Sequence, residues 1–255
     1  MNVEKFNQKP LKVGWIKAVL FDLFDTLLLI RSDDNFAESC LRNIHRFLNM
    51  NGINVSFEDF RHTYSKVRKH LYERIHRKLE EPHFTVRISR VLRELGYECD
   101  ASSPIAKGAA DAYCEAFTRY VHPDEDAYFV LRRLRKSGYK IGIVSNFAIP
   151  ECAHHLITLY GLKNLLDAVV VSAEVNRRKP SPEIFVAALN LLKVDASESI
   201  FVGDTPDIDI LGAKNIGMKA ILIERRKTSF KADVKPDFMI KRLREILGLL
   251  KISSP

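Results

Sequence analysis

The 255-residue sequence lacks the features that mark several whole classes of protein. No apolar run approaches the ~18 residues of a membrane-spanning helix, and residues 1–14 contain no apolar stretch typical of a secretory signal. Only 11 glycines and 10 prolines are present, while 46% of residues are apolar and 28% are charged, which excludes collagen-like chains and wholesale disorder. We therefore expect a folded cytoplasmic protein that has no membrane association.

Cysteine is also scarce, and its spacing excludes several kinds of site. Cys40, Cys99, Cys114 and Cys152 form no CxxC pair. This spacing argues against a zinc ribbon, a redox motif and a disulfide framework. The sequence predicts four buried thiols.

Basic residues outnumber acidic ones, 40 to 32, and give a formal net charge of +8. This balance suits an anionic ligand, either a phosphate ester or a nucleic acid. The basic runs at 132–136 and 225–227 contain no interleaved aromatic residues and belong to no recognisable nucleic-acid-binding module. We interpret them as solvated faces, so nucleic acid is not the expected partner. The sequence does not determine the oligomeric state.

Six short apolar runs, mostly β-branched, predict β-strands. They lie at 18–21, 140–144, 168–171, 200–202, 220–223 and 237–240. Helical patterns at 150–159, 182–192 and 207–216 alternate with the later runs. This alternation predicts an α/β fold, in which helices cover both faces of a parallel sheet.

More than a hundred residues separate the first two predicted strands, and they read as helical throughout. The predicted helices lie at 36–51, 56–78, 85–95, 105–120 and 126–136. So long a block cannot be an ordinary connection within a sheet. We therefore predict an all-helical domain at 31–122, inserted into an α/β core at 15–30 and 123–255.

Polar residues follow the predicted strands, where an open parallel sheet binds its ligands. Asp22 follows the first strand, Ser145 and Asn146 follow the second, and Asp204 follows the fourth, with Asp209 a little further on. Lys179 lies after the third strand, just before a helix for which Ser181 is a suitable N-cap.

This set of residues suits attack on a phosphoryl centre. A carboxylate such as Asp22 can be a covalent nucleophile, and Asp22, Asp204 and one backbone carbonyl suit octahedral Mg²⁺. The hydroxyl of Ser145, an amide N–H near it and the ammonium of Lys179 would hold the remaining phosphoryl oxygens. We expect Asn146 to belong to the same substrate-binding set.

The ordered set resembles the haloacid dehalogenase superfamily. It consists of Asp22-x-x-x-Thr26, Ile143-Val144-Ser145-Asn146, Arg178-Lys179-Pro180, and Val202-Gly203-Asp204 followed by Asp209. The resemblance implies a Rossmann-like parallel sheet and a helical cap inserted after the nucleophile strand. It also implies Asp22 as nucleophile, Ser145 and Lys179 as phosphate binders, the Phe24 main-chain carbonyl as a metal ligand, and Asp204 with Asp209 at the metal end.

Phe24 departs from the pattern of the phosphatases in that superfamily, which usually carry a second aspartate at this position as general acid and base. Phenylalanine cannot transfer a proton, a function that contributes ~10²–10⁴ in rate. The substrate could have a good leaving group, as an acyl or aryl phosphate does, or Asp25 or a cap residue could supply the proton. We interpret Asp25 as a turn residue that satisfies local backbone groups. Phe24 would then face the cap and shape the substrate pocket.

Three functions remain open. We prefer a Mg²⁺-dependent phosphatase of small phosphorylated metabolites, because clustered carboxylates need a cation. The alternative enzyme is a 2-haloacid dehalogenase, since that branch has an aromatic residue at the place of Phe24. Dehalogenases of the superfamily generally lack the Gly-Asp carboxylate pair, however, whereas this chain has Gly203-Asp204 and Asp209. The third is a catalytically weak relative that binds a nucleotide or RNA.

Two alternatives without a catalytic role also remain. Ser145 and Asn146 could simply form the turn between a strand and a helix. Asp209 could be an ordinary acid of a first helical turn, where it suits the helix dipole.

Overall fold

The computed structural model describes residues 15–31, 33, 35–225 and 235–252. Arg226 and Lys227 of the second basic run therefore lie outside the described residues. Six parallel strands form one sheet in the order β5-β4-β1-β6-β7-β8. They are β1 (Ala18–Phe21), β4 (Lys140–Ser145), β5 (Ala168–Val171), β6 (Ser199–Gly203), β7 (Lys219–Ile223) and β8 (Phe238–Ile240). The predicted strands and α/β fold are confirmed to within two residues at each end.

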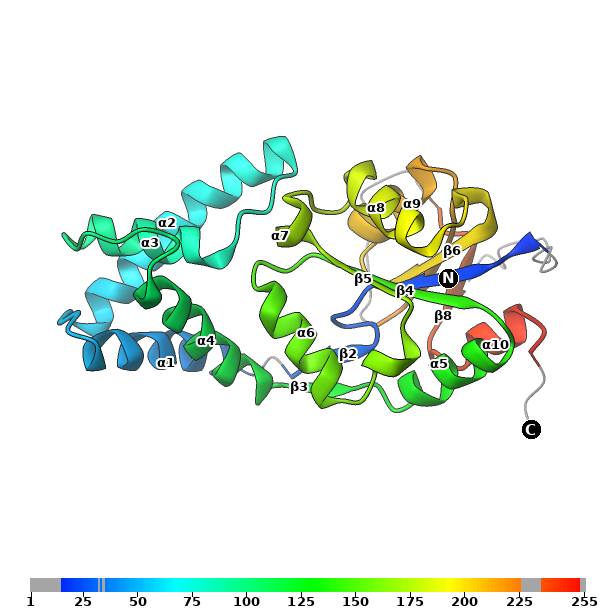
Figure 1. The fold of residues 1–255 in the computed structure, drawn as a ribbon, viewed down its shortest axis with the longest axis horizontal. Coiled ribbons are helices and arrows are strands. Elements are labelled where there is room, and N and C mark those ends of the chain that lie inside the picture. The colour runs from blue at the N-terminus through cyan, green and yellow to red at the C-terminus, as the bar shows by residue number, and fades with distance from the viewer. Residues whose placement is uncertain (1–14, 32, 34, 226–234, 253–255) are drawn as a thin grey trace, which may run out of the picture.

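Side chains alternate between the two faces of this sheet, because successive residues of a strand point to opposite sides. Val19 and Phe21 of β1 belong to the larger apolar cluster, and Ala18 and Leu20 to the smaller one. The smaller cluster lies under α8 (Pro182–Leu192) and α9 (Leu211–Asn215). The larger cluster includes residues of α5 (Ala127–Lys136), α6 (Pro150–Leu159) and α10 (Glu245–Leu249). Both faces are therefore covered, and the strand ends are left for function (Figure 1).

Four helices lie in the segment where the insertion is predicted. It contains α1 (Phe36–Met50), α2 (Phe57–Lys78), α3 (Phe84–Glu94) and α4 (Pro104–Thr118). Helix α1 packs on α4, and α3 packs on both α2 and α4. Figure 1 shows these four helices beyond the carboxyl ends of the central strands, beside the loops that follow them.

Two short strands that the sequence did not reveal join the insertion to the core. β2 (Leu28–Ile30) and β3 (Val121–Pro123) pair antiparallel, with Leu29 opposite His122. Three residues are too few for a periodic pattern, which explains why the prediction missed them. The chain therefore leaves and re-enters the core at one place.

The prediction of four buried thiols was wrong for one pair. Cys114 of α4 and Cys152 of α6 form a disulfide, whereas Cys40 and Cys99 are free and buried as expected. Spacing along the chain could not reveal the pair, because the two helices meet only in the folded insertion and core. The disulfide connects the insertion to the core. None of the described helices combines the length and the apolar character that crossing a bilayer requires.

Reduction of this disulfide should destabilise the protein. The bond closes a loop between residues 38 apart in sequence, and loop-closure entropy predicts a loss of about 3–4 kcal/mol in unfolding free energy on reduction. Denaturant unfolding with and without a dithiol would measure this. The Cys114→Ala/Cys152→Ala double variant should show no effect of the dithiol, whereas Cys40→Ala should respond as the wild type does. Superimposable wild-type curves in both buffers would contradict the prediction.

Candidate active site

The carboxyl ends of β1, β4 and β6 meet because β1 lies between the other two. The backbone N–H of Asp22 donates to the Val202 carbonyl at 2.8 Å, which continues the β1–β6 ladder by one residue. Asp22 is therefore held at the sheet edge between the ends of β4 and β6. Carboxylate oxygens of Asp22, Asp204 and Asp209 all lie within 4.8 Å of one another.

Lys179 lies among these acids and forms two ion pairs. Its Nζ is 2.6 Å from Asp22 Oδ1 and 2.8 Å from Asp209 Oδ1, and the side chain is 2% exposed. Burial alone lowers the pKa of Lys179, but Asp209 and Asp22 raise it by more, so the amine stays charged. One cation thus faces three carboxylates in a buried site.

The excess of negative charge affects the pKa values of the acids. Burial and the carboxylate of Asp209 raise the pKa of Asp204 to about 7. Burial, together with the charges of Asp209 and Asp204, raises the pKa of Asp22, although Lys179 opposes this. A divalent cation would remove the repulsion, and oxygen ligands are those that Mg²⁺ prefers. The residues present therefore fit such an ion.

Asp209 is fixed by a close approach to Gly203. It lies in the π-helical turn Pro206–Ile210, and its Oδ2 accepts from the Thr205 N–H at 3.0 Å. A Cβ at Gly203 would come within 2.4 Å of Asp209 Oδ2, so only glycine leaves room for this carboxylate. Both oxygens of Asp209 therefore have protein partners, one of which is Lys179.

Ser145 ends β4 and is fully buried, yet its Oγ has no hydrogen-bond partner among the described residues. A buried hydroxyl without a partner is costly, and such groups mark binding sites for missing ligands or water. The side chain of the neighbouring Asn146 contacts the backbone of Lys179. Its Oδ1 accepts from the Lys179 N–H at 2.7 Å and its Nδ2 donates to the Lys179 carbonyl at 3.0 Å. The side chain of Asn146 therefore positions the backbone of Lys179.

The loop after β1 places Phe24 against the insertion. Its ring centroid lies 5.4 Å from that of Phe117 in α4 and 4.8 Å from that of Phe147. Asp25 adopts a left-handed backbone conformation with φ of 53°, and its Oδ1 accepts from the Ile30 N–H at 3.2 Å. Both placements agree with the expectation that Phe24 faces the cap and that Asp25 serves the turn.

One other expectation needs correction. Ser181 occupies the N-cap of α8, but its hydroxyl bonds to the Glu183 side chain and does not cap a backbone N–H.

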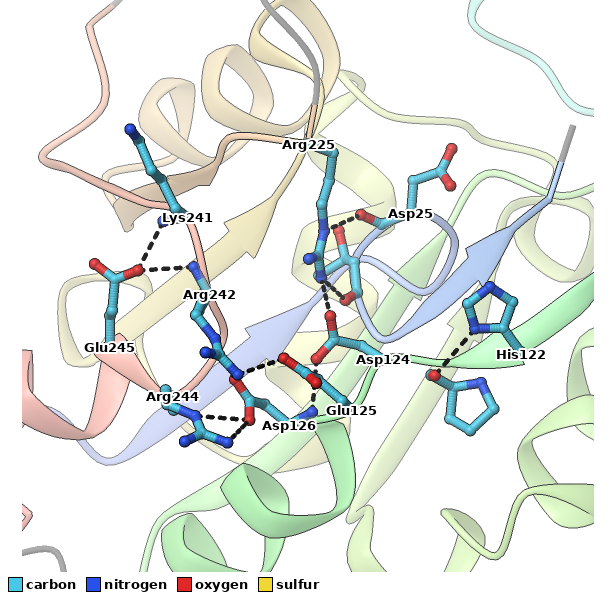
Figure 2. A network of polar contacts seen from close by, with 12 residues as sticks. Asp25, His122, Asp124, Glu125, Asp126, Arg225, Lys241, Arg242, Arg244 and Glu245 are labelled. Carbon is cyan, nitrogen blue, oxygen red and sulfur yellow. Dashed lines mark hydrogen bonds and ion pairs between the residues drawn. The ribbon is translucent and has the colours of Figure 1, made fainter.

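Arg225 was misread as part of a solvated basic run. Its guanidinium donates to the carbonyls of Asp25 (3.0 Å) and Thr26 (2.8 Å), and it pairs with Asp124 at 2.8 Å. Figure 2 shows Arg225 reaching across to the turn that carries Asp25. It lies two residues beyond β7, so the same strand-end rule that selected Asp22 could have found it. The loop after β1 is thereby tied to the start of α5.

Comparisons with known proteins establish the family. Residues 16–217 match the haloacid dehalogenase-like hydrolases. The chain is 33% identical over 250 residues to the glyceraldehyde 3-phosphate phosphatase of Methanopyrus kandleri, covering 92% of this chain and 97% of the relative. It is 29% identical over 158 residues to the phosphoserine phosphatase of Thermus thermophilus, covering 62% of each. The chain belongs to the haloacid dehalogenase-like hydrolases, which confirms the resemblance.

Solved structures agree on the fold. A HAD phosphatase from Thermococcus onnurineus matches with a TM-score of 0.65 and 23% identity, covering 93% of this chain and 99% of that one. A 2-haloacid dehalogenase from Pseudomonas syringae pv. Tomato DC3000 matches with a TM-score of 0.72 and 24% identity, covering 92% and 98%. Phosphatases and dehalogenases share this architecture, so the fold does not choose between the reactions.

The raised pKa of Asp204 predicts a pH-dependent stability. Because its folded pKa of about 7 exceeds its ordinary value of 3.8, the folded state holds the proton more tightly. Stability in chelator should therefore fall as pH rises from about 4 to 7. Asp204→Asn should remove this penalty and raise the unfolding free energy at pH 8 by about 2 kcal/mol, with little gain near pH 4.

Denaturant unfolding in chelator at both pH values would test this. Asp111→Asn, at an exposed position of α4, is the matched control and should leave stability unchanged at both pH values. A variant less stable than the wild type at pH 8 would contradict the assignment.

Proposed function

We propose that the protein is a Mg²⁺-dependent phosphatase of small phosphorylated metabolites and that it acts in the cytoplasm. The observation that carries this is the convergence of Asp22, Asp204 and Asp209 on Lys179 at one end of the sheet. The names of the relatives from Methanopyrus kandleri and Thermus thermophilus support the same reaction class. Residues 31–122 serve as the cap, and residues 15–30 and 123–255 as the core.

In this proposal Asp22, the Phe24 carbonyl and Asp204 hold the metal, with Asp209 beside them. Both oxygens of Asp209 already have protein partners, so its main contribution is to fix Lys179 and the Asp204 loop. Bound Mg²⁺ would neutralise the carboxylates and the incoming phosphoryl oxygens.

Asp22 is the nucleophile. One of its oxygens bonds to phosphorus while the bond from phosphorus to the leaving oxygen breaks, which gives an aspartyl phosphate that water then hydrolyses. Lys179 keeps the carboxylate oriented through its 2.6 Å ion pair. Lys179 and the unpartnered hydroxyl of Ser145 hold phosphoryl oxygens as charge develops.

Phe24 restricts the substrates that this site can process. The leaving oxygen receives no proton from position 24, and the Asp25 carboxylate is bonded to the Ile30 backbone. The site therefore favours acyl or aryl phosphates, whose leaving groups depart as stable anions. Alkyl phosphates, which need protonation, should turn over slowly.

Dehalogenation is the second candidate, and Phe24 is the observation that favours it. A halide ion departs from carbon without being protonated, so a dehalogenase needs no acid at position 24 and can carry an aromatic residue there. The close grouping of Asp204 and Asp209 with Asp22 weighs against it, because a metal-free reaction gains nothing from repelling carboxylates. A nucleotide- or RNA-binding relative is the third reading, and Arg225 no longer supports it, since that side chain anchors a loop.

A metal-dependence test separates these functions. We expect wild-type protein to release phosphate from para-nitrophenyl phosphate with Mg²⁺ and to lose this activity in chelator. Asp22→Asn should be inactive, because the nucleophile is gone, yet should remain folded and bind Mg²⁺. The exposed Asp111→Asn protein is the matched control and should keep full activity.

Other outcomes identify the rivals. Halide release from a 2-haloacid that persists in chelator would establish the dehalogenase. Inertness toward acyl, aryl and alkyl phosphates, with RNA affinity that falls steeply as salt rises and is unchanged in Asp22→Asn, would establish the binding protein.

Restoring the missing acid tests the account of Phe24. Phe24→Asp should raise the single-turnover rate of leaving-group release from an alkyl phosphate by about 10²-fold, toward the range that a general acid supplies. It should change the same rate for para-nitrophenyl phosphate far less, because nitrophenolate leaves without a proton. This measurement excludes the later hydrolysis of the aspartyl phosphate, which is the same step for both substrates. Phe24→Asn, which loses the same ring contacts but carries no acid, is the control and should give no gain. Equal effects of both variants on both substrates would refute the account.

A further inference from the structure

The insertion contains a cavity of about 400 Å³ that the proposed chemistry does not use. Its walls come from α1, α2, α3 and α4, and include Tyr64, Tyr72, Arg87 and Tyr113. This volume falls in the range of small-molecule sites. The walls combine aromatic rings with arginines, which suits an anionic group on an organic body.

Arg87 is the unusual member of this lining. The residue is 9% exposed, and its guanidinium lies 5.1 Å from the ring centroid of Phe84, 5.6 Å from that of Tyr72 and 5.7 Å from that of Tyr64. Among the described residues its only acceptor is the Tyr64 hydroxyl, at 2.9 Å from Nη1. Its Nε is buried and has no partner there.

A buried guanidinium normally has a carboxylate partner, because burying an unpaired charge is expensive. Within the described part of the chain, Arg87 forms no ion pair. The acid of the cavity, Glu38, accepts from Arg42 at 2.6 Å. Arg61, at the exposed side, is paired with Glu58 at 2.8 Å. Arg87 is therefore a buried cation for which the described residues supply no anion.

The cavity lies beside the proposed phosphoryl site. Its wall residue Tyr113 stacks on Phe117 at 5.8 Å between centroids, and Phe117 contacts Phe24. On the other side the Tyr72 ring lies 5.9 Å from the guanidinium of Arg178, the residue before Lys179. The wall of the cavity thus contacts Phe117, which contacts Phe24, on one side and Arg178 on the other.

Helix α3 brings Arg87 toward the same loops. The N–H of Phe84, at its first turn, donates to the Ala148 carbonyl at 2.8 Å, three residues beyond Ser145. Arg87 lies one helical turn from Phe84, roughly 5 Å along the axis. Helix α3 therefore contacts the loop that follows Ser145, and Arg87 lies one turn away from that contact.

We propose that Arg87 binds a second anionic group of the substrate, a carboxylate or a second phosphoryl group, at the end remote from the reacting phosphate. This inference rests on the proposed phosphatase function and narrows its substrate class to phosphate esters with a second anion. Together with Phe24, it predicts an acyl or aryl phosphate that carries an additional acidic group.

Matched aryl phosphates test the proposal. The probes are para-carboxyphenyl phosphate, para-phenylene bisphosphate and the neutral para-carbamoylphenyl phosphate. We expect wild-type kcat/KM to be about 10- to 100-fold higher for at least one of the two probes with a second anion than for the neutral one, chiefly through KM, as charged hydrogen bonds permit. The probe that gains more identifies the second group as carboxylate or phosphoryl.

Three variants assign the effect to Arg87. Arg87→Met should abolish the preference while leaving kcat/KM for the neutral probe within about threefold. Arg90→Met, at an exposed position of the same helix, should keep the full preference. Arg87→Lys keeps the positive charge but loses the planar guanidinium with its paired donors, so it should keep part of the preference. It serves as the test if Arg87→Met does not fold. No preference in the wild type, or an unchanged preference in the Arg87 variants, would overturn the proposal.

A binding measurement separates this inference from the proposed function. If the wild type hydrolyses none of the probes, the phosphatase proposal fails, and calorimetry with Mg²⁺ and para-carboxybenzylphosphonate decides the role of Arg87. At least about tenfold weaker binding to Arg87→Met than to wild type and Arg90→Met would support the anion site. Equal binding to all three, or no binding to any, would exclude it.

Discussion

The double ion pair of Lys179 with Asp22 and Asp209 is the interaction on which the rest of the site depends. A single buried ammonium holds together acids from the loop after β1 and from the turn after β6, two segments that are distant in sequence. Asn146 fixes the backbone of Lys179 on both sides, and Gly203 leaves the space for Asp209. Because one positive charge faces three carboxylates, the apo site keeps an excess of negative charge. That excess explains why the site would bind a divalent cation, and it also destabilises the site when no cation is bound.

The insertion supplies aromatic and charged side chains beside the site at the sheet edge. In the proposed function, the core would provide the nucleophile, together with a cation and an unpartnered hydroxyl at the sheet edge. The insertion adds Phe117 against Phe24 and a cavity with a buried arginine. Under the same proposal, α1–α4 would select the substrate and exclude water, whereas the bond-making groups would come from the loops of the sheet. Phe24 would link the two tasks, because without an acid at this position the leaving group becomes part of the specificity.

The elements that the sequence predicted well are those with a strong local signal. Buried β-branched runs and amphipathic helices are visible in any short window, and the strand-end rule is enough to place Asp22, Ser145 and Asp204 at one edge of the sheet. The features that were missed depend on packing between distant segments. The pairing of Cys114 with Cys152, the short β2–β3 pair and the anchoring of the nucleophile loop by Arg225 all require knowing which segments meet. Arg87 likewise looks ordinary in sequence, and only its burial without an acid distinguishes it.

The disulfide has a mechanical consequence for the insertion. Cys114 lies in the last turns of α4, close in sequence to β3, and Tyr160 at the end of α6 donates to the Val121 carbonyl at 2.5 Å. The covalent bond and the two strand connections therefore lie along one side of the junction. On the other side, the α2–α3 connection contacts the core non-covalently, for example through the hydrogen bond from the Arg178 N–H to the Leu79 carbonyl and through His83 with Glu151. Because the covalent bond and both strand connections lie on one side of the junction, any motion of the insertion would pivot there and separate the α2–α3 connection from the core.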